Sequence, residues 1–268
     1  MSHNLYLVPH DFTSVGDVAL KYAMHIGKHV KTEIQVVHIV SDKSKVAAAK
    51  QKIDAILNNF PKEANVELTS LVEVGTIFED IGKIAKREYA QLIIMGTHGQ
   101  VGMQKLFGSH AMKVITSSNV PFLVVQEKTP LIEIKKIIVP IDLTKESLQI
   151  TNVAGDLAMM FDAELHIVTE KVTDPLQSKK MATRILLVKN QYDDRKLTSS
   201  VTHIEGSGSF QKKIIDYTKA NQGDLIALAY HTESLLPQFD KFAQSLMTNE
   251  LNLPCAIINS KSASSSYF

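Results

Sequence analysis

The beginning of this chain is repeated at its middle, and the repeat limits the folds that are open to it. Leu5–Ser14 (LYLVPHDFTS) returns as Lys136–Lys145 (KIIVPIDLTK), an offset of 131 residues. Further along, Leu92–Met95 returns as Leu225–Leu228 at an offset of 133. A repeat of this length predicts two similar folded units in tandem. Turn-forming residues at Glu127–Pro130 mark the boundary, which divides the chain into residues 1–130 and 131–268.

Within each half, short apolar runs alternate with longer segments whose apolar residues recur at helical spacing. In the first half we predict strands at Leu5–Val8, Glu33–Val40, Val66–Val74, Leu92–Met95 and Phe122–Val125. Helices are predicted at Val15–Val30 and Val46–Phe60, along Ile77, Ile81, Ile84 and Ala85, and through Met112 and Ile115. Continuous apolar strands separated by helices are typical of a parallel sheet covered on both faces. Each half is therefore expected to be α/β, a doubly wound, mostly parallel sheet of five strands with Rossmann-like order.

Three local patterns add detail to this fold. Ser14, with Asp17 three residues later, predicts a variant of the capping box at the start of the first helix. In the second half the helical stretch at Thr173–Arg184 is shorter and poorer than its counterpart. Gly206–Gly208 is typical of a turn between a strand and a helix, with a backbone nest for an anion as the less favoured alternative.

The composition excludes several classes of protein. A net charge of +1 gives no reason to expect nucleic acid or an anionic membrane as a partner. No apolar run approaches the roughly 18–20 residues of a membrane span, and Met1–His10 lacks the pattern of a secretory signal. Cys255 is the single cysteine, so it forms no intramolecular disulfide, and we expect it to be buried. Together these features predict a cytoplasmic protein.

The segment most informative about function follows the strand predicted at Leu92–Met95. It reads MGTHGQVGMQKLFGSH and has glycines at positions 96, 99, 102 and 108. In a doubly wound sheet, ligands bind beyond the carboxyl ends of the strands, where glycine lets backbone N–H groups approach an anion. Gly108 and Ser109 open the next predicted helix, whose positive end favours a phosphate. The plainer alternative is a turn before a capped helix, and neither a P-loop nor a dinucleotide fingerprint occurs.

These residues resemble a known family. The order of elements, the VPHDF sequence at Val8–Phe12 and above all the loop that ends in Gly108 and Ser109 are similar to a universal stress protein domain. Two such domains resemble the tandem form, and the resemblance implies a fold like that of the adenine nucleotide alpha hydrolases. Eight residues separate Gly99 from Gly108, one fewer than in the G-x-x-G…G-[ST] pattern of nucleotide-binding members. Either the loop absorbs this difference or Gly108 and Ser109 lie out of reach of a phosphate.

The resemblance implies a site for ATP, or for ADP or AMP, together with Mg²⁺. Asp11 would face the ribose and adenine, and backbone groups of Ile39 would meet the adenine edge. The phosphates would be held by Gly96, Gly99, Gly108 and Ser109. Independently of the resemblance, His98 lies beside the loop glycines and can also contact a phosphate.

The residues taken by themselves leave other roles open. Asp11 can compete with Ser14 to cap the first helix. His98 can act as an acid or base or be a plain polar loop residue, and Ser109 can serve as a helix cap and ligand only. The family resemblance adds phosphorylation of Ser109 as a further alternative. In the second half, Ala229 and Thr232 replace the first two loop glycines, so we expect no ATP site of this kind there.

The function that these expectations favour is regulatory. We expect a stress-response protein that binds an adenine nucleotide in its first domain and whose occupancy alters contacts with an unknown protein partner. A structural module without a nucleotide is the alternative, and a slow ATPase is a third. No nucleophile and base are assembled in the sequence, so no catalytic or metal-ligating residue is expected, and turnover would be at most weak hydrolysis or self-phosphorylation. Family dimers commonly join through their last strands, which implies pairing of the halves through Phe122–Gln126 and Ala256–Asn259. A homodimer of the whole chain stays open.

Overall fold

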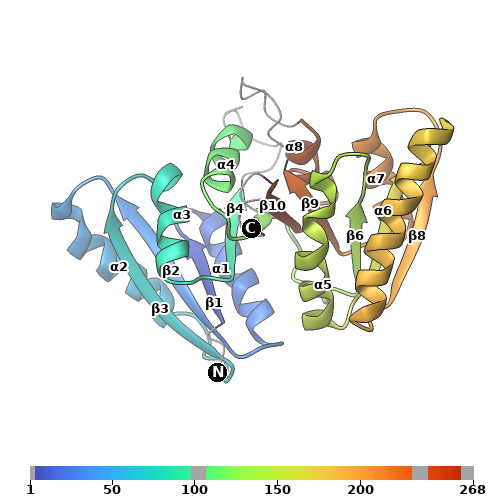
Figure 1. The fold of residues 1–268 in the computed structure, drawn as a ribbon. Coiled ribbons are helices and arrows are strands. Elements are labelled where there is room, and N and C mark those ends of the chain that lie inside the picture. The colour runs from blue at the N-terminus through green and yellow to red at the C-terminus, as the bar shows by residue number, and fades with distance from the viewer. Residues whose placement is uncertain (1–3, 98–106, 231–240, 261–268) are drawn as a thin grey trace. The chain divides into compact units, whose positions relative to one another are not determined.

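The computed structural model describes residues 4–97, 107–230 and 241–260 (Figure 1). The chain divides into two compact units, Met1–Leu131 and Ile132–Phe268. The elements of the first unit are β1 (Leu5–Pro9), α1 (Ser14–Gly27), β2 (Thr32–Val40), the 3₁₀ turn η1 (Lys43–Lys45), α2 (Val46–Asn58), β3 (Val66–Val74), α3 (Ile77–Arg87), β4 (Leu92–Thr97), α4 (Phe107–Thr116) and β5 (Phe122–Gln126).

The second unit repeats this order. Its elements are β6 (Lys136–Pro140), the 3₁₀ turn η2 (Glu146–Leu148), α5 (Ile150–Phe161), β7 (Glu164–Glu170), α6 (Pro175–Asp194), β8 (Ser199–Ile204), α7 (Phe210–Ala220), β9 (Leu225–Tyr230), α8 (Lys241–Met247) and β10 (Cys255–Asn259).

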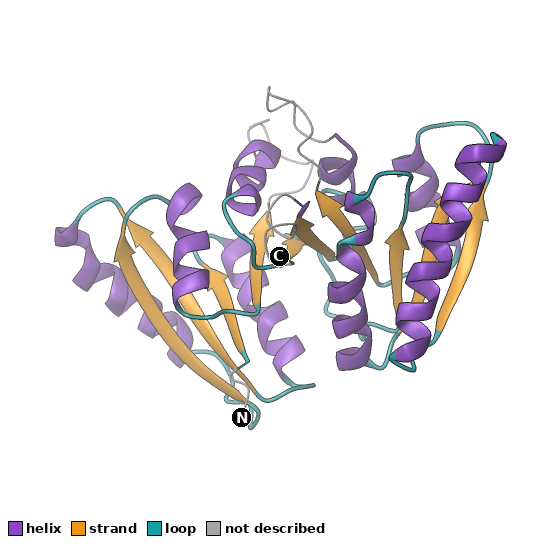
Figure 2. Ribbon diagram, in the orientation of Figure 1, coloured by secondary structure: helices purple, strands orange, loops and turns teal. Residues whose placement is uncertain are grey.

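Each unit holds five strands whose described pairings are all parallel. The strand order is β3-β2-β1-β4-β5 in the first unit and β10-β9-β6-β7-β8 in the second. Helices cover both faces of each sheet (Figure 2). In the first unit, α3 and α4 contact each other on one face, and α1 and α2 lie on the other. The predicted α/β fold class, with two tandem doubly wound units, is confirmed.

The core of each unit lies between the sheet and its helices. In the first unit, Leu7 and Ile93 of neighbouring strands and Leu20 of α1 are fully buried. Burying one such side chain contributes about 1.5–3 kcal/mol. Within the described ranges, no helix is long and apolar enough to cross a lipid bilayer.

The helix α6 differs from its prediction. The sequence suggested a short, poor stretch at Thr173–Arg184, but α6 runs for 20 residues to Asp194. The Asp174 side chain caps it by accepting a hydrogen bond from the Gln177 N–H at 2.8 Å, and Pro175 occupies its first turn. Its buried residues recur at the spacing of one helical face, namely Met181, Ile185, Val188 and Tyr192. Burial of this apolar face stabilises the helix although most of its other residues are polar.

The single cysteine supplies a first prediction. Cys255 begins β10 and is fully buried, and burial raises the pKa of its thiol. Since the thiolate is the reactive species, we expect negligible labelling of the folded protein by a disulfide-exchange reagent at neutral pH and one equivalent of labelling after denaturation. Fast, stoichiometric labelling of the native protein would contradict this burial.

Candidate functional site

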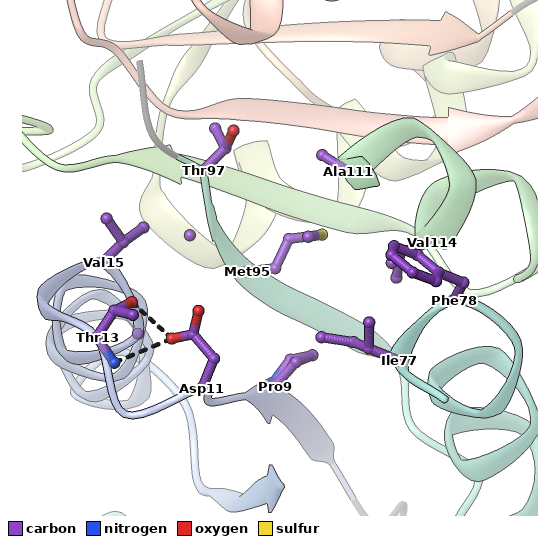
Figure 3. A pocket seen from close by; sticks show the side chains of 12 residues that line it. Pro9, Asp11, Thr13, Val15, Ile77, Phe78, Met95, Thr97, Ala111 and Val114 are labelled. Atoms are coloured by element: carbon purple, nitrogen blue, oxygen red, sulfur yellow. Dashed lines mark hydrogen bonds between the residues drawn. The ribbon is translucent and has the colours of Figure 1, made fainter. Parts of the chain in front are cut away.

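A pocket of about 270 Å³ lies at the carboxyl ends of β1 and β4 in the first unit. The strand order reverses here, because the chain builds β2 and β3 on one side of β1 and then places β4 on the other. Ligands of doubly wound sheets bind at this switch point. The described residues that line the pocket (Figure 3) are Pro9, Asp11, Thr13, Val15, Gly16, Ile77, Phe78, Met95, Gly96, Thr97, Ala111 and Val114.

Asp11 supplies the carboxylate of this pocket. Its Oδ1 accepts hydrogen bonds from the Thr13 N–H at 3.0 Å and from the Thr13 hydroxyl at 2.5 Å. Its Oδ2 has no hydrogen-bond partner among the residues that the structure describes, and in Figure 3 it points away from Thr13. One oxygen of Asp11 therefore builds the turn after β1, and the other can accept a hydrogen bond from a ligand.

The start of α1 differs from the predicted capping box. Thr13 is the N-cap residue, and no side chain caps the helix. The hydroxyl of Ser14, the first helical residue, donates to Glu127 at 3.2 Å, and Asp17 contacts His10 instead of the helix end. Neither Asp11 nor Ser14 caps α1, because Asp11 bonds to the turn. The uncapped N-terminus of α1 contributes Thr13 and Gly16 to the pocket wall, and such an end favours an anion.

Gly96 lines the pocket, and its lack of a side chain has a packing reason. A Cβ on Gly96 would lie 2.2 Å from Val15 Cγ1 and 2.4 Å from the Val15 carbonyl oxygen. The first turn of α1 thus lies directly against β4. The second unit has Ala229 at the matching position in β9, and there the 3₁₀ turn η2 contacts β9 and the α-helix begins only at Ile150. A glycine at this position therefore permits the close approach of the helix.

The other predicted site residues are distributed as follows. Ile39 is half-buried near the end of β2, in register with Glu73, and is not among the described lining residues. His98 and Gly99 lie outside the described residues. Gly108 and Ser109 belong to the first turn of α4, but their side-chain environment lies outside the described part of the chain. Farther along α4, Ala111 and Val114 reach the pocket.

Sequence reasoning missed the wall that α3 and α4 build. Ile77 was predicted only as part of one face of α3, and the structure shows that it lines the pocket with Phe78 and with Val114 of α4. Lys113 places its Nζ 5.5 Å from the centre of the Phe78 ring, a cation–π distance. The signal that could have found this wall is the turn at Gly75–Thr76, because a helix that starts directly after β3 begins at the same edge of the sheet.

The matching turn of the second unit makes additional hydrogen bonds with side chains of that unit. Asp142 Oδ1 accepts a hydrogen bond from the Thr144 N–H at 2.8 Å, as Asp11 does from Thr13. The Thr144 carbonyl oxygen then accepts hydrogen bonds from the Ser147 hydroxyl at 3.0 Å and from the Arg184 guanidinium of α6. In the first unit, Gly16 stands where the second unit has Ser147. The turn is shared by both units, whereas these additional bonds belong to the second.

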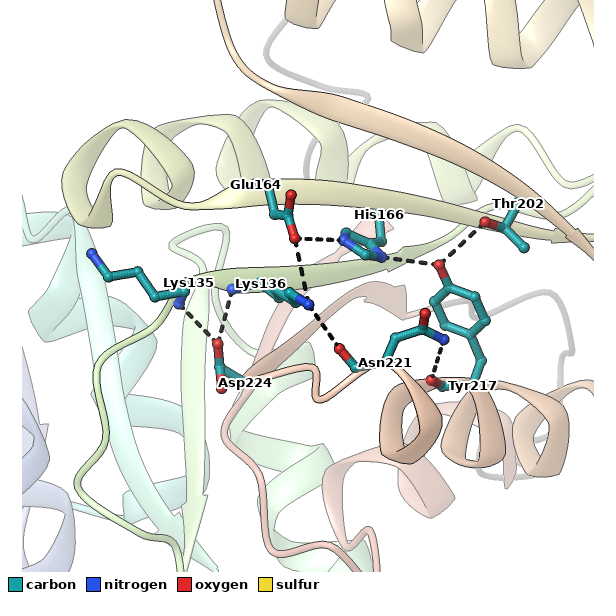
Figure 4. A network of polar contacts seen from close by, with 8 residues as sticks. All are labelled: Lys135, Lys136, Glu164, His166, Thr202, Tyr217, Asn221 and Asp224. Carbon is teal, nitrogen blue, oxygen red and sulfur yellow. Dashed lines mark hydrogen bonds and ion pairs between the residues drawn. The ribbon is translucent and has the colours of Figure 1, made fainter.

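A separate polar network in the second unit connects β6, β7, β8 and α7 (Figure 4). His166 donates from Nε2 to Glu164 at 3.1 Å and accepts at Nδ1 from the Tyr217 hydroxyl at 2.9 Å. The Thr202 hydroxyl lies 3.2 Å from that of Tyr217. The hydrogen bond from His166 is the main cause that lowers the pKa of Glu164. Glu164 begins β7, so the network lies toward the amino ends of the strands and away from the ligand-binding edge.

Comparison with known proteins agrees with this architecture. The model of the universal stress protein family matches residues 6–126 and again residues 133–247. The chain belongs to the universal stress protein family. It has the tandem two-domain form of the family, since each folded unit carries its own match.

Individual relatives give the same picture. A universal stress protein of Methanocaldococcus jannaschii is 27% identical over 152 residues, which cover 46% of this chain and 94% of the relative. A universal stress protein structure from Archaeoglobus fulgidus superposes with a TM-score of 0.73 at 18% identity, covering 97% of this chain and all of the other. One from Pseudomonas aeruginosa gives a TM-score of 0.67 at 14% identity, covering 98% and 96%. These structures are similar in fold.

Proposed function

We propose that the first unit of this universal stress protein binds an adenine nucleotide, ATP or else ADP or AMP, and that occupancy regulates its contacts with another protein in a stress response. The observation that carries the proposal is the pocket at the switch point between β1 and β4, with Asp11 directing an oxygen away from its turn. Members of this family commonly bind ATP. At about 270 Å³ the described pocket is close to the lower end, roughly 300 Å³, of small-molecule sites.

The lining residues fit the parts of a nucleoside. Ile77, Met95 and Val114 supply apolar surface for a base. The Asp11 carboxylate can accept a hydrogen bond from a ribose hydroxyl. The uncapped N-terminus of α1 favours a negatively charged group. Bound Mg²⁺ would neutralise part of the phosphate charge.

The remaining assignments of the site rest on the family resemblance. We assign the adenine edge to backbone groups of Ile39, and the phosphates to Gly96, Gly99, Gly108 and Ser109. His98 is assigned to a phosphate because it lies beside the loop glycines in sequence. No step of turnover is needed, because a regulatory role requires only that the bound and free forms differ in their contacts.

A purely structural role is the second candidate, and one observation favours it. Gly96 is explained by its packing against Val15, so this glycine does not by itself require a phosphate. In that case both units would serve only as interaction modules.

A calorimetric titration of the whole chain with ATP and Mg²⁺ separates the two candidates. We expect saturable heat with one equivalent bound, and a stabilisation of about 2.7 kcal/mol at a ligand concentration of one hundred times Kd. A titration with GTP is the specificity control. If saturating ATP, ADP and AMP all give no heat and no rise in melting temperature, the nucleotide proposal fails and the structural role remains.

Asp11 gives the sharpest mutational test of this proposal. Asp11→Asn is expected to weaken ATP binding about tenfold, since a hydrogen bond to a charged acceptor contributes about 1.5–3 kcal/mol. Asp142→Asn is the matched control, because Asp142 makes the same turn in the second unit, and it is expected to leave ATP affinity unchanged. Equal losses in both variants would indicate a folding effect and contradict the role of Asp11.

Two further parts of the proposal concern the whole chain. We propose that the two units pair through Phe122–Gln126 and Ala256–Asn259, as the family's dimers do through their last strands. The protein is proposed to act in the cytoplasm, where its single cysteine would stay reduced.

A further inference from the structure

The residue after Asp11 has an unusual backbone conformation. Phe12 has φ = 66°, in the left-handed region that bulky residues rarely adopt. The Phe12 ring contacts two other side chains, and its centre lies 4.1 Å from that of the His38 ring and 4.0 Å from the Nζ of Lys52. The Phe12 N–H donates a hydrogen bond to Nδ1 of His10 at 3.0 Å. These contacts together hold Phe12 in this conformation.

The hydrogen bonds of His10 define its protonation state. His10 is buried, and its Nε2 lies 3.1 Å from Oδ1 of Asp17 on α1. An ionised carboxylate only accepts, so the hydrogen of this bond is on Nε2. The Phe12 N–H only donates, so Nδ1 must carry a lone pair. His10 is therefore the neutral Nε2–H tautomer, which is the only form that satisfies both partners.

The backbone and ring of His10 are fixed as well. Its N–H donates to the Val37 carbonyl at 2.9 Å, and its own carbonyl accepts from Nδ1 of His38 at 2.6 Å. A Cβ on Gly16 would lie 3.0 Å from Cδ2 of His10, so the ring is wedged between the end of β1 and the first turn of α1. His10 thus connects both elements that flank the Asp11 turn.

The second unit shows what the turn looks like without this histidine. Ile141 and Leu143 stand where the first unit has His10 and Phe12. Leu143 does not have a positive φ, and Thr144 still donates to Asp142. The aspartate turn therefore forms without a histidine, whereas the left-handed residue occurs together with it. The bond from Phe12 to His10 is a feature of the first unit.

We propose that His10 is a positioning residue: by accepting the hydrogen bond of the Phe12 N–H, it holds the Asp11 carboxylate in the orientation that binds the ligand. Protonation of His10 then weakens nucleotide binding. Protonated Nδ1 carries a hydrogen, so it and the Phe12 N–H become two donors facing each other, and the hydrogen bond is lost. Histidine is the side chain that ordinarily changes charge between about pH 5 and 8. By linkage, bound nucleotide in turn favours neutral His10. This inference rests on the proposed function of the pocket.

Two charged side chains lie close to His10 and Phe12. Asp17 on α1 contacts the imidazole of His10, and Lys52 of α2 lies above the Phe12 ring. His38 on β2 donates from Nδ1 to the His10 carbonyl, so a proton added at its Nε2 leaves that bond intact. Asp11 is tied to Thr13 and does not bond to the imidazole. The bond that acid breaks directly is the one from Phe12 to His10.

The first test needs no ligand. In ¹⁵N–¹H correlation spectra of the uniformly ¹⁵N-labelled full-length protein, His10 is expected to show the neutral Nε2–H pattern at about pH 8. The His10→Asn spectrum assigns the signal. The Phe12 amide resonance should shift in step with the protonation of His10. A neutral Nδ1–H tautomer, or a Phe12 amide that does not respond, would overturn the positioning role.

The second test compares ATP affinity at about pH 8 and about pH 5.5 in three proteins. On acidification, the ATP affinity of the wild type is expected to fall about tenfold more than that of His10→Asn, because loss of one hydrogen bond corresponds to about 1.4 kcal/mol. In His10→Asn, the amide oxygen Oδ1 replaces Nδ1 of the histidine as the acceptor of the hydrogen bond from the Phe12 N–H, and an amide does not titrate. His10→Ile copies the second unit and is expected to bind weakly at both values. Protonation of ATP itself affects all three proteins alike.

The outcomes separate this inference from the function on which it rests. An equal loss on acidification in wild type and His10→Asn overturns the inference and leaves nucleotide binding intact. The inference also fails if His10→Asn has the melting temperature of the wild type but binds ATP as weakly as His10→Ile does at about pH 8. If no protein binds ATP, ADP or AMP at either pH, the proposed function fails, the linkage to nucleotide fails with it, and the spectra still decide whether His10 holds the turn.

Discussion

Replacing Gly96 by valine is expected to lower the free energy of unfolding by about 3 kcal/mol, the upper end for overpacking in a core. The Cβ alone would lie 2.2 Å from Val15 Cγ1 and 2.4 Å from the Val15 carbonyl oxygen. A flexible side chain could turn away, but the carbonyl belongs to the backbone of α1, so the helix and β4 must separate. Since a whole domain is stable by about 5–15 kcal/mol, the loss would be large.

The measurement is urea unfolding followed by circular dichroism, because the chain has no tryptophan. Ala229→Gly is the matched control at the same position of the second unit. It removes a Cβ instead of adding one and is expected to cost only about 0.5–1 kcal/mol, the usual cost of glycine in a strand. A Gly96→Val protein with the stability of the wild type would show that α1 does not approach β4 as closely as described.

Truncating Ile226 to alanine is expected to destabilise the protein by about 2–5 kcal/mol. Ile226 lies in β9 between its register partners Ile138 and Cys255, and none of its surface is exposed. Removing its outer carbons leaves a cavity that the flanking strands cannot fill, because parallel strands are held by their ladders on both sides. The expected decrease in the free energy of unfolding is several times larger than that for the truncation of an exposed side chain.

Leu187→Ala serves as the control for this truncation in the same unit. Leu187 lies on α6 with 58% of its surface exposed, and its replacement is expected to change the free energy of unfolding by less than about 0.5 kcal/mol. Urea midpoints of the two variants give the comparison directly. Equal midpoints would contradict the assignment of Ile226 to the core.

Much of the fold was accessible from sequence because strands and helices depend on local periodicity. The run from Val66 to Val74 became β3 with both ends as predicted. The longest helix, α6, was underestimated, because its buried stripe from Met181 to Tyr192 is diluted by lysines and other polar residues. The predicted capping box of α1 was also wrong, because Asp17 contacts the side chain of His10, which follows β1, instead of the end of its own helix.

The candidate site was accessible only in part. Asp11 was found because it follows a strand, and Gly96 because it stands in a glycine-rich segment; both line the pocket. Phe78 and Val114 were missed, since their sequence pattern is that of ordinary helix residues. The roles of Gly99 and Ser109 toward phosphate remain predictions.

The sequence by itself determined the duplication, the alternation of strands and helices, and the family, because each of these depends on patterns that neighbouring residues carry along the chain. The tertiary structure alone decided which side chains share the pocket, why Gly96 must lack a Cβ and which hydrogen bonds fix His10. These features arise where β1, β4 and the helices meet. Contacts between residues far apart in sequence depend on how elements pack, and no local pattern records that packing.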